Sequence, residues 1–231
     1  MKDSISYFEK INKGSALIDL GYRDYIAARV LLNKHLLVQG LTLASTSVEK
    51  YLKAIIVLNL KKKEHYHYHL DRFESLKKLL SKLNNDVTEE FDSIFLDILQ
   101  NAFRIRYYDK INRPIFMGFY INQFIGELDF TVDFMEKYIY SSQNGGFSMT
   151  KYFQAIENND THLYENNYIL KNENKKEFME RSDIGFSIYI NTGPKFHREN
   201  VVKGGITKNK YDGEISKFTD FSETIFSNNR R

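Results

Sequence analysis

The sequence predicts a mainly α-helical protein, with an antiparallel bundle of about five helices and a small C-terminal appendage that is α+β or partly disordered. Three observations predict this fold class. Apolar residues recur at three- and four-residue spacing through most of residues 15–141, the links between those stretches are short, and aliphatic residues become fewer after Ser141. We therefore divide the chain into a helical bundle at 15–141 and an unassigned appendage at 142–231.

The composition is typical of a globular protein that buries a core. Among the 231 residues, 42% are hydrophobic, 27% are charged and none is cysteine. A chain without cysteine has no disulfide, no thiolate zinc site and no cysteine nucleophile. The formal net charge of +3 permits nucleic acid as a partner without requiring it, because such affinity depends on local clusters of Lys and Arg.

Two kinds of targeting signal are not visible. Residues 1–14 lack the apolar middle of a secretory signal peptide, and no apolar run reaches membrane-spanning length. We therefore expect a cytoplasmic protein with no membrane partner.

The bundle is organised around residues 44–58, ASTSVEKYLKAIIVL, which we expect to form one long helix. Its apolar face comprises Ala44, Val48, Leu52 and Ile55. Ser45, Glu49 and Lys53 form a second row at four-residue spacing, and Glu49 precedes Lys53 in the favourable order for an ion pair. A polar row on so apolar a helix faces either solvent or a binding site, and both interpretations remain open at this point.

Four further stretches with helical spacing complete the bundle. Residues 15–38 precede the central helix, and Gly40 marks the turn between them, so these two helices should form an antiparallel hairpin. Residues 61–69 are a polar connection to a third helix at 70–83.

The fourth and fifth helices follow a predicted cap and a predicted break. Asp86 with Glu89 has the form of a capping box, with Asp in place of Ser or Thr, at the start of a helix whose core face runs over 91–105. This helix should end near 107–112, because Pro114 disfavours helical geometry at the residue before it. The last helix of the bundle is expected from Gly118 to about Tyr140.

The appendage begins at the boundary signal SSQNGG. Within it, residues 151–157 are interpreted as a short helix and the alternating 184–191, IGFSIYIN, as a strand. Gly204-Gly205, between Val201-Val202 and Ile206, predicts a hairpin turn. Because polar residues dominate this segment, a disordered tail competes with the α+β interpretation.

Four stretches in this order resemble the HEPN domain, whose name abbreviates higher eukaryotes and prokaryotes nucleotide-binding. They are GYRDYIAARVLL, ASTSVEKYLKAIIVL, the His69-Leu70 pair that opens a leucine-rich helix, and a helix that ends in IRYYD. The most specific part is VEKYLKA at 48–54. The resemblance covers residues 15–141 and implies an all-α bundle that is commonly dimeric.

Many HEPN domains of toxin–antitoxin, CRISPR and abortive-infection systems are RNases that carry an Arg and, a few residues later, a His after the fourth helix. Here Arg104 and Arg106 stand in that place, but residues 107–112 contain no His, and the nearest downstream is His162. Histidine moves protons near neutral pH, whereas Arg stays charged and can only hold or stabilise phosphate. We therefore expect no catalysis, with Arg104 and Arg106 as the catalytic candidates if the chain is an RNase.

The IRYYD segment is instead similar to the Ala-Arg-Tyr-Pro-Asp element of the HEPN branch that includes sacsin-like and nucleotidyltransferase-associated domains, with Tyr108 in place of Pro. That branch is linked to nucleotide or polyanion binding and to dimerisation. By this resemblance, the nucleotide- or phosphate-binding residues would be Glu49, Lys53, Arg104, Arg106, Tyr107 and Asp109. Arg forks suit phosphate and aromatic faces suit bases, but an Arg–carboxylate bridge within the bundle is the competing interpretation.

Three other patterns are better explained by a solvated surface than by a site. The alternating histidines His65, His67 and His69 lack a visible fourth ligand, so we predict no metal. The lysines at 61–63 and at 77, 78 and 82 are typical of an exposed face rather than an RNA-binding one. Gly204-Gly205 lacks the strand–loop–helix context of a phosphate loop, and we predict no cofactor.

These observations leave three functional hypotheses. The first is a non-catalytic HEPN-type domain that binds nucleotide or RNA phosphate and forms a homodimer, in a prokaryotic defence or toxin–antitoxin-type module with a protein partner from the same operon. The second is a metal-independent HEPN ribonuclease whose Arg-His motif departs from the family pattern. The third is a purely structural interaction bundle whose dimer face is the fourth helix.

Overall fold

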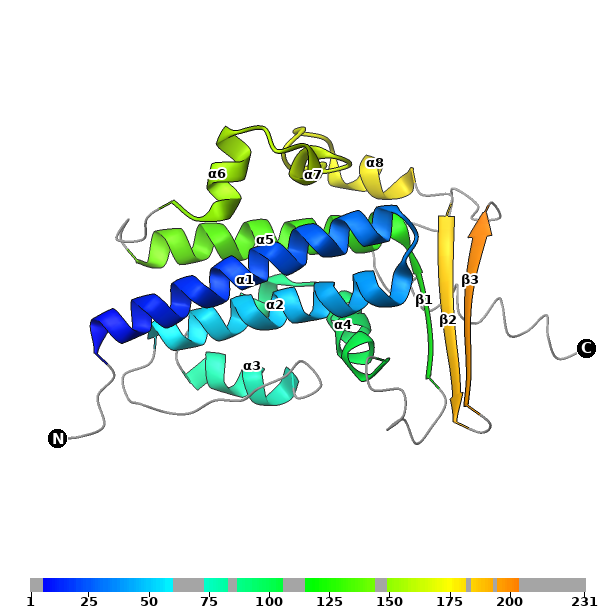
Figure 1. Ribbon diagram of the computed structural model, residues 1–231, viewed down its shortest axis with the longest axis horizontal. Helices are drawn as coiled ribbons and strands as arrows, with labels where there is room; N and C mark the ends of the chain where they lie inside the picture. Colours follow the sequence, from blue (N-terminus) through cyan, green and yellow to red (C-terminus); the bar gives the residue numbers. More distant parts are fainter. Residues whose placement is uncertain are drawn as a thin grey trace, which may run out of the picture.

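The computed structural model describes residues 6–59, 73–82, 87–105, 115–143, 149–181, 184–192 and 195–203. These residues form eight α-helices, a short 3-10 helix and three β-strands (Figure 1). Helices dominate, so the predicted mainly α-helical fold is confirmed. No helix in the described ranges combines the length and the apolar character that crossing a membrane requires.

Helices α1 (Tyr7–Asn33) and α2 (Leu37–Asn59) form the predicted antiparallel hairpin. The turn lies at residues 34–36, and Gly40 is inside α2, so the prediction that Gly40 marks the turn is wrong. A Cβ at Gly40 would lie 2.7 Å from Leu32 Cγ. The glycine is therefore explained by the close approach of the two helices and not by a change of chain direction.

The third and fourth helices are α3 (Phe73–Lys82) and α4 (Ser93–Ile105). Between them Val87–Glu90 form a 3-10 helix, and the Oδ1 atom of Asp92 accepts a hydrogen bond of 2.7 Å from the Phe95 N–H. The prediction that Asp86 and Glu89 start the fourth helix is therefore wrong, because Glu89 lies in the 3-10 helix and Asp92 caps α4. Asp86 lies outside the described residues.

Strand β1 (Ile115–Tyr120) precedes α5 (Ile121–Ser142), so the fifth helix does not begin at Gly118 as the sequence predicts. Gly118 instead pairs with Ser187 of β2 (Ile184–Thr192), which in turn pairs with β3 (Lys195–Lys203). The sheet is antiparallel in the order β1-β2-β3. The strand predicted at 184–191 is confirmed, and the hairpin turn predicted at Gly204-Gly205 lies outside the described residues.

Residues 149–181 form a layer over α1 and α5, which we call the cap layer (Figure 1). It contains α6 (Lys151–Glu157), as predicted, with α7 (Thr161–Tyr164) and α8 (Lys175–Glu180). Three of its side chains belong to the same hydrophobic core as the bundle: Tyr152, Ala155 and Leu163. The predicted division at residue 142 coincides with the end of α5, but it does not separate two cores.

Helices α1, α2, α4 and α5 supply most of that core. Its largest fully buried apolar side chains include Tyr25, Tyr51, Phe95, Phe119 and Phe124. Helix α2 packs against α1 on one side and against α4 on another, and it also contacts α5. This central position explains why α2 buries apolar residues along its whole length, from Leu37 to Leu58.

Candidate functional site

The polar row of α2 runs from the interior towards the surface. Ser45 is fully buried, Glu49 is 6% exposed, and the Lys53 side chain retains 20% of its accessible surface. Lys53 Nζ lies 2.5 Å from Glu49 Oε1. The pair is therefore confirmed, but it is largely buried and not a solvated surface pair.

Ser45 and Glu49 of this row point away from α1, whereas Lys53 lies on nearly the same side of α2 as Thr46, which is hydrogen-bonded to Asp24 of α1. Ser47 donates to the Gly21 carbonyl and Lys50 pairs with Asp24, so the α2 face that includes these two residues lies against α1. Glu49 follows Ser47 by two residues, about 200° around the helix. Helix α4 also packs against α2.

The remaining predicted phosphate-binding residues follow in α4 and beyond. Arg104 lies in the last turn of α4, where the backbone is described. Arg106, Tyr107 and Asp109 lie outside the described residues. The structure thus brings Glu49 and Lys53 together and puts Arg104 on a helix that packs against α2.

Histidine does not reach this junction from the cap layer. His162 lies in α7, on the side of the bundle opposite α4 (Figure 1). In the described parts of the chain, no three side chains of His, Asp or Glu gather as metal ligands. The histidines at 65, 67 and 69, the lysines at 61–63 and Gly204-Gly205 lie outside the described residues, whereas Lys78 and Lys82 are exposed on α3.

A second set of polar groups was not predicted as a site. Helix α5 carries four acids that are almost completely buried, and three of them share one helix face: Asp129, Asp133 and Glu136. Their oxygens accept hydrogen bonds from tyrosines of three other helices, Tyr25, Tyr51 and Tyr152. Burial raises the pKa of all three tyrosines, so their hydroxyls remain protonated donors.

Asp129 is paired with the fully buried Arg29 of α1. The same guanidinium donates to the backbone carbonyls of Glu165 and of His162, the latter over 3.5 Å. The Tyr25 hydroxyl also donates to Asp129 Oδ1, at 2.8 Å. One arginine therefore joins α1, α5 and the cap layer, which indicates a structural role for this end of the network.

Glu136 is the acid of this network whose pKa departs most from its ordinary value. It is 0% exposed, and it accepts hydrogen bonds from the Tyr51 hydroxyl at 2.5 Å and from Thr150 Oγ1 at 2.8 Å. Burial raises its pKa to about 7, which the two hydrogen bonds oppose and the nearby Asp133 reinforces. A carboxyl group of this kind changes its charge near neutral pH, as general acids and bases and pH sensors do.

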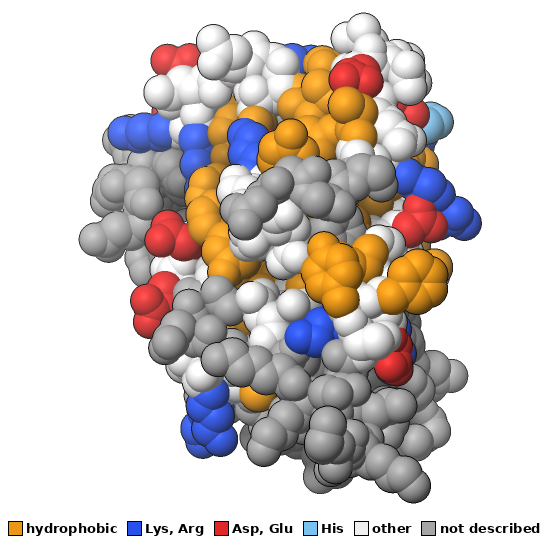
Figure 2. Space-filling view, turned by 90° about the vertical axis from the view of Figure 1, so that its left-hand side faces the viewer, with side chains coloured by type: hydrophobic (Ala, Val, Ile, Leu, Met, Phe, Trp, Pro, Cys, Tyr) orange, Lys and Arg blue, Asp and Glu red, His pale blue; other side chains and the backbone are white. Residues whose placement is uncertain are grey.

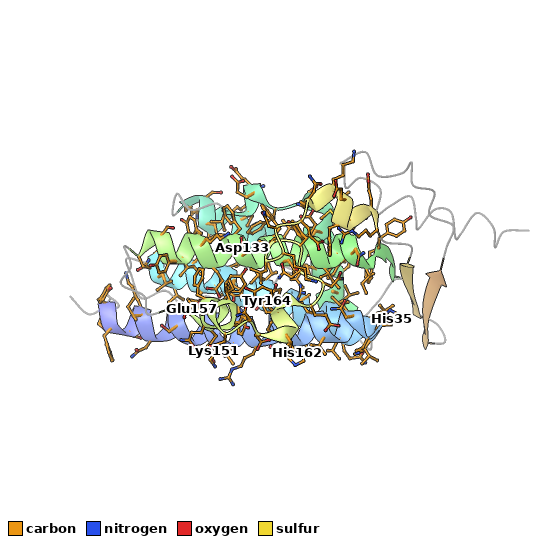
Figure 3. All side chains as sticks on the ribbon, turned by 90° about the horizontal axis from the view of Figure 1, so that it is seen from above. His35, Asp133, Lys151, Glu157, His162 and Tyr164 are labelled. Atoms are coloured by element: carbon orange, nitrogen blue, oxygen red, sulfur yellow. The ribbon has the colours of Figure 1, made fainter. Side chains whose placement is uncertain are left out.

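Thr150 also lines an open cavity of about 210 Å³. It is lined by Ser15, Ile18, Asp19, Met149, Thr150, Lys151 and Gln154. Lys151 forms an ion pair with Asp19, which also pairs with Arg23. Figure 3 shows Lys151 at the start of α6 and Asp133 on α5, as seen from the cap layer.

The sequence contained a signal for this network. Asp129, Asp133 and Glu136 lie at i, i+4 and i+7 within a helix of otherwise apolar spacing, which puts them on one face. That pattern is also typical of an exposed polar stripe. The tyrosine and threonine donors come from α1, α2 and the start of α6, and no sequence spacing indicates that they meet.

Four of the six large exposed apolar side chains in the described residues gather at one end of the bundle, whereas Leu20 and Leu36 are exposed elsewhere. Within 93–102, the exposed residues of α4 are Ser93 and Asp97, and Ile94 is half-buried. Figure 2 shows hydrophobic side chains gathered on the end where α1 and α6 begin and α5 ends. The large exposed apolar residues at these helix ends are Tyr7, Phe8, Tyr140 and Met149.

Comparison with known proteins found no match of any of three kinds: no family model, no curated protein and no solved structure.

Proposed function

We propose that this chain is a non-catalytic HEPN-type domain that binds nucleotide or RNA phosphate and forms a homodimer. We also propose that it acts with a protein partner in a prokaryotic defence or toxin–antitoxin-type module. The basis for the family and the setting is the sequence resemblance, with VEKYLKA at 48–54 as its most specific part.

The observation that carries the binding proposal is the position of the Glu49–Lys53 pair. Glu49 holds the ammonium group of Lys53 in a largely buried location, and Lys53 still retains part of its accessible surface. An ammonium group has three N–H donors, and the contact with Glu49 Oε1 leaves others for an anion. A cation that is already held in place loses little conformational entropy when a phosphate binds.

Charge balance adds a condition to the proposal. Glu49 neutralises Lys53, so this pair alone gives no net attraction for phosphate. Arginines at the end of the fourth helix, Arg104 and Arg106, would supply the net positive charge. We therefore expect the affinity to depend on Lys53 and on Arg106.

Titration of a short fluorescent single-stranded RNA, followed by anisotropy at several salt concentrations, tests this proposal. Lys53→Ala or Arg106→Ala should weaken binding roughly tenfold and reduce the salt slope by about one counterion. Lys78→Ala, a change of the same kind at an exposed position on α3, is the matched control and should change affinity by less than about twofold. Unchanged affinity in both site variants would contradict the proposal.

The same samples, run on a denaturing gel, separate binding from cleavage. The proposal expects intact RNA at high protein concentration with a metal chelator present. Cleavage that is lost in Arg106→Ala would replace it with the ribonuclease hypothesis. Light scattering of the free chain tests the proposed homodimer independently.

A further inference from the structure

Apolar side chains gather where α1 and α6 begin and α5 ends, and we call this surface the apolar end (Figure 2). It comprises Tyr7, which is 70% exposed, Phe8, which is 73% exposed, and Tyr140 and Met149, which are each nearly half exposed. An aromatic side chain has about 150–250 Å² of surface, so the three rings alone leave on the order of 400 Å² in contact with water. Exposed apolar surface of this extent is often functional.

The open cavity of about 210 Å³ adjoins the apolar end, because Met149 belongs to both. Its lining includes the buried Ile18 and the exposed Ser15, and it contains no aromatic ring. A cavity of about 150 Å³ can hold one benzene molecule, so this cavity has room for the ring of one aromatic side chain.

Phe8 lies on the same side of α1 as the cavity. At 100° per residue, Phe8, Ser15 and Asp19 point within about 20° of one another. The cavity begins about 10 Å further along the helix than Phe8, because each residue rises 1.5 Å. A second copy of α1 in the antiparallel direction would place its Phe8 opposite the first copy's Ser15, and the reverse contact would form at the same time. Such an exchange is the self-complementary geometry of a twofold dimer.

The charges beside this face suit the same arrangement. Glu9 and Lys13 form an ion pair over 3.4 Å and lie on one flank of the face that carries Phe8. When Phe8 is opposite Ser15 of a second copy, Glu9 is near Lys13 of that copy, so acid meets base on both sides of the twofold axis. Asn12, which is exposed and uncharged, lies close to the axis, and Lys10 is turned about 200° away from Phe8.

The area is also of the right size. A stable dimer buries about 800 Å² on each partner, and somewhat more than half of it is apolar. The apolar end supplies most of that apolar part, and Glu9 and Lys13 belong to a polar rim.

We propose that the apolar end and the adjoining cavity form the interface between two copies of this chain. The N-terminal turns of the two α1 helices lie antiparallel across a twofold axis, and the Phe8 ring of each copy fills the cavity of the other. This interface rests on the homodimer proposed above and gives it a location, and it does not involve Lys53 or Arg106.

Sedimentation velocity of the full chain over a range of concentrations tests the interface. Phe8→Ser should raise the dimer Kd roughly a hundredfold, because it removes a central aromatic anchor. Ser15→Tyr fills the cavity from an exposed position and should weaken the dimer to a similar extent. Leu20→Ser is the matched control: Leu20 is a nearly half-exposed apolar residue of α1 outside the apolar end, and its replacement should change the Kd less than about threefold.

Cross-linking gives a second readout, because the chain contains no cysteine. Asn12→Cys puts a single thiol close to the proposed twofold axis, and a short bis-maleimide should join two copies through it. Asp97→Cys puts a thiol at an exposed position of α4 and should give no cross-linked dimer. Circular dichroism checks that each variant keeps the helical fold.

The outcomes separate this interface from the rest of the proposed function. A wild-type chain that stays monomeric at its highest soluble concentration would refute both the interface and the homodimer. A dimer that survives both Phe8→Ser and Ser15→Tyr, or that cross-links through position 97 and not through position 12, would overturn the α1 interface and leave a homodimer formed elsewhere. RNA affinity that Lys53→Ala and Arg106→Ala leave unchanged would refute the phosphate site without affecting the interface.

Discussion

Arg29→Met tests whether one buried arginine holds the cap layer on the bundle. Methionine keeps the length and the apolar contacts of the arginine stem but removes its charge and its donors. Arg29 is completely buried, and its guanidinium contacts Asp129 and the carbonyls of His162 and Glu165. The substitution therefore leaves one carboxylate without its cation and two carbonyls without a donor.

The expected cost is large compared with the stability of a typical domain. Removal of one partner from a buried ion pair costs about 3–5 kcal/mol, because the other charge remains buried and unpaired. We expect a loss near 4 kcal/mol, moderated by the Tyr25 hydroxyl, which still donates to Asp129. Arg23→Met is the matched control: Arg23 is 62% exposed in its pair with Asp19, and its loss should cost less than about 1 kcal/mol.

A double variant separates the destabilisation caused by the unpaired charge from the destabilisation caused by lost packing. Arg29→Met combined with Asp129→Asn removes both charges and keeps an oxygen that accepts from Tyr25. This combination should recover roughly 2 kcal/mol relative to Arg29→Met alone.

Urea unfolding at pH 7 measures these differences as changes in the midpoint at constant slope. A loss below about 1 kcal/mol for Arg29→Met, or no recovery in the double variant, would refute the reasoning that Arg29 compensates a buried charge.

Three further predictions concern packing and pH. Gly40→Ala should destabilise the hairpin by about 1–3 kcal/mol, because its Cβ would lie 2.7 Å from Leu32 Cγ. Lys175→Met should cost about 1–3 kcal/mol at pH 8, because Lys175 lies 2.8 Å from Glu127, whose side chain is 2% exposed. That cost should shrink at pH 5, since burial raises the pKa of Glu127 and a proton can replace the lysine. Glu136→Gln should gain stability relative to the wild type by about 2 kcal/mol between pH 5 and pH 8, since the raised pKa of Glu136 favours folding only at low pH.

Urea midpoints check all three predictions, and Lys176→Met is the control for Lys175→Met. Lys176 is 60% exposed in an i,i+4 pair with Glu180, so its replacement should change the free energy of unfolding by less than about 0.5 kcal/mol. A Gly40→Ala variant as stable as the wild type would mean that Leu32 moves without cost. Equal losses for Lys175→Met at pH 5 and pH 8 would contradict the account of Glu127.

The candidate phosphate site was predictable only as a pattern. The spacing of Glu49 and Lys53 indicates an ion pair, and the structure confirms it. The spacing does not show whether that pair is solvated, because the burial of a side chain depends on segments that are distant in sequence. The spacing of Asp129, Asp133 and Glu136 indicates a common helix face, but their partners come from segments that only the fold brings together.

The sequence by itself determined the helical class, the α1–α2 hairpin, α6 and the strand β2. These features depend on hydrophobic periodicity and local chain geometry, which short stretches of sequence encode directly. Only the tertiary structure decided that residues 115–120 form a strand, that Gly40 lies inside a helix and that the cap layer shares the core of the bundle. Each of these depends on contacts between distant segments, whose energies outweigh the local preferences of the residues involved.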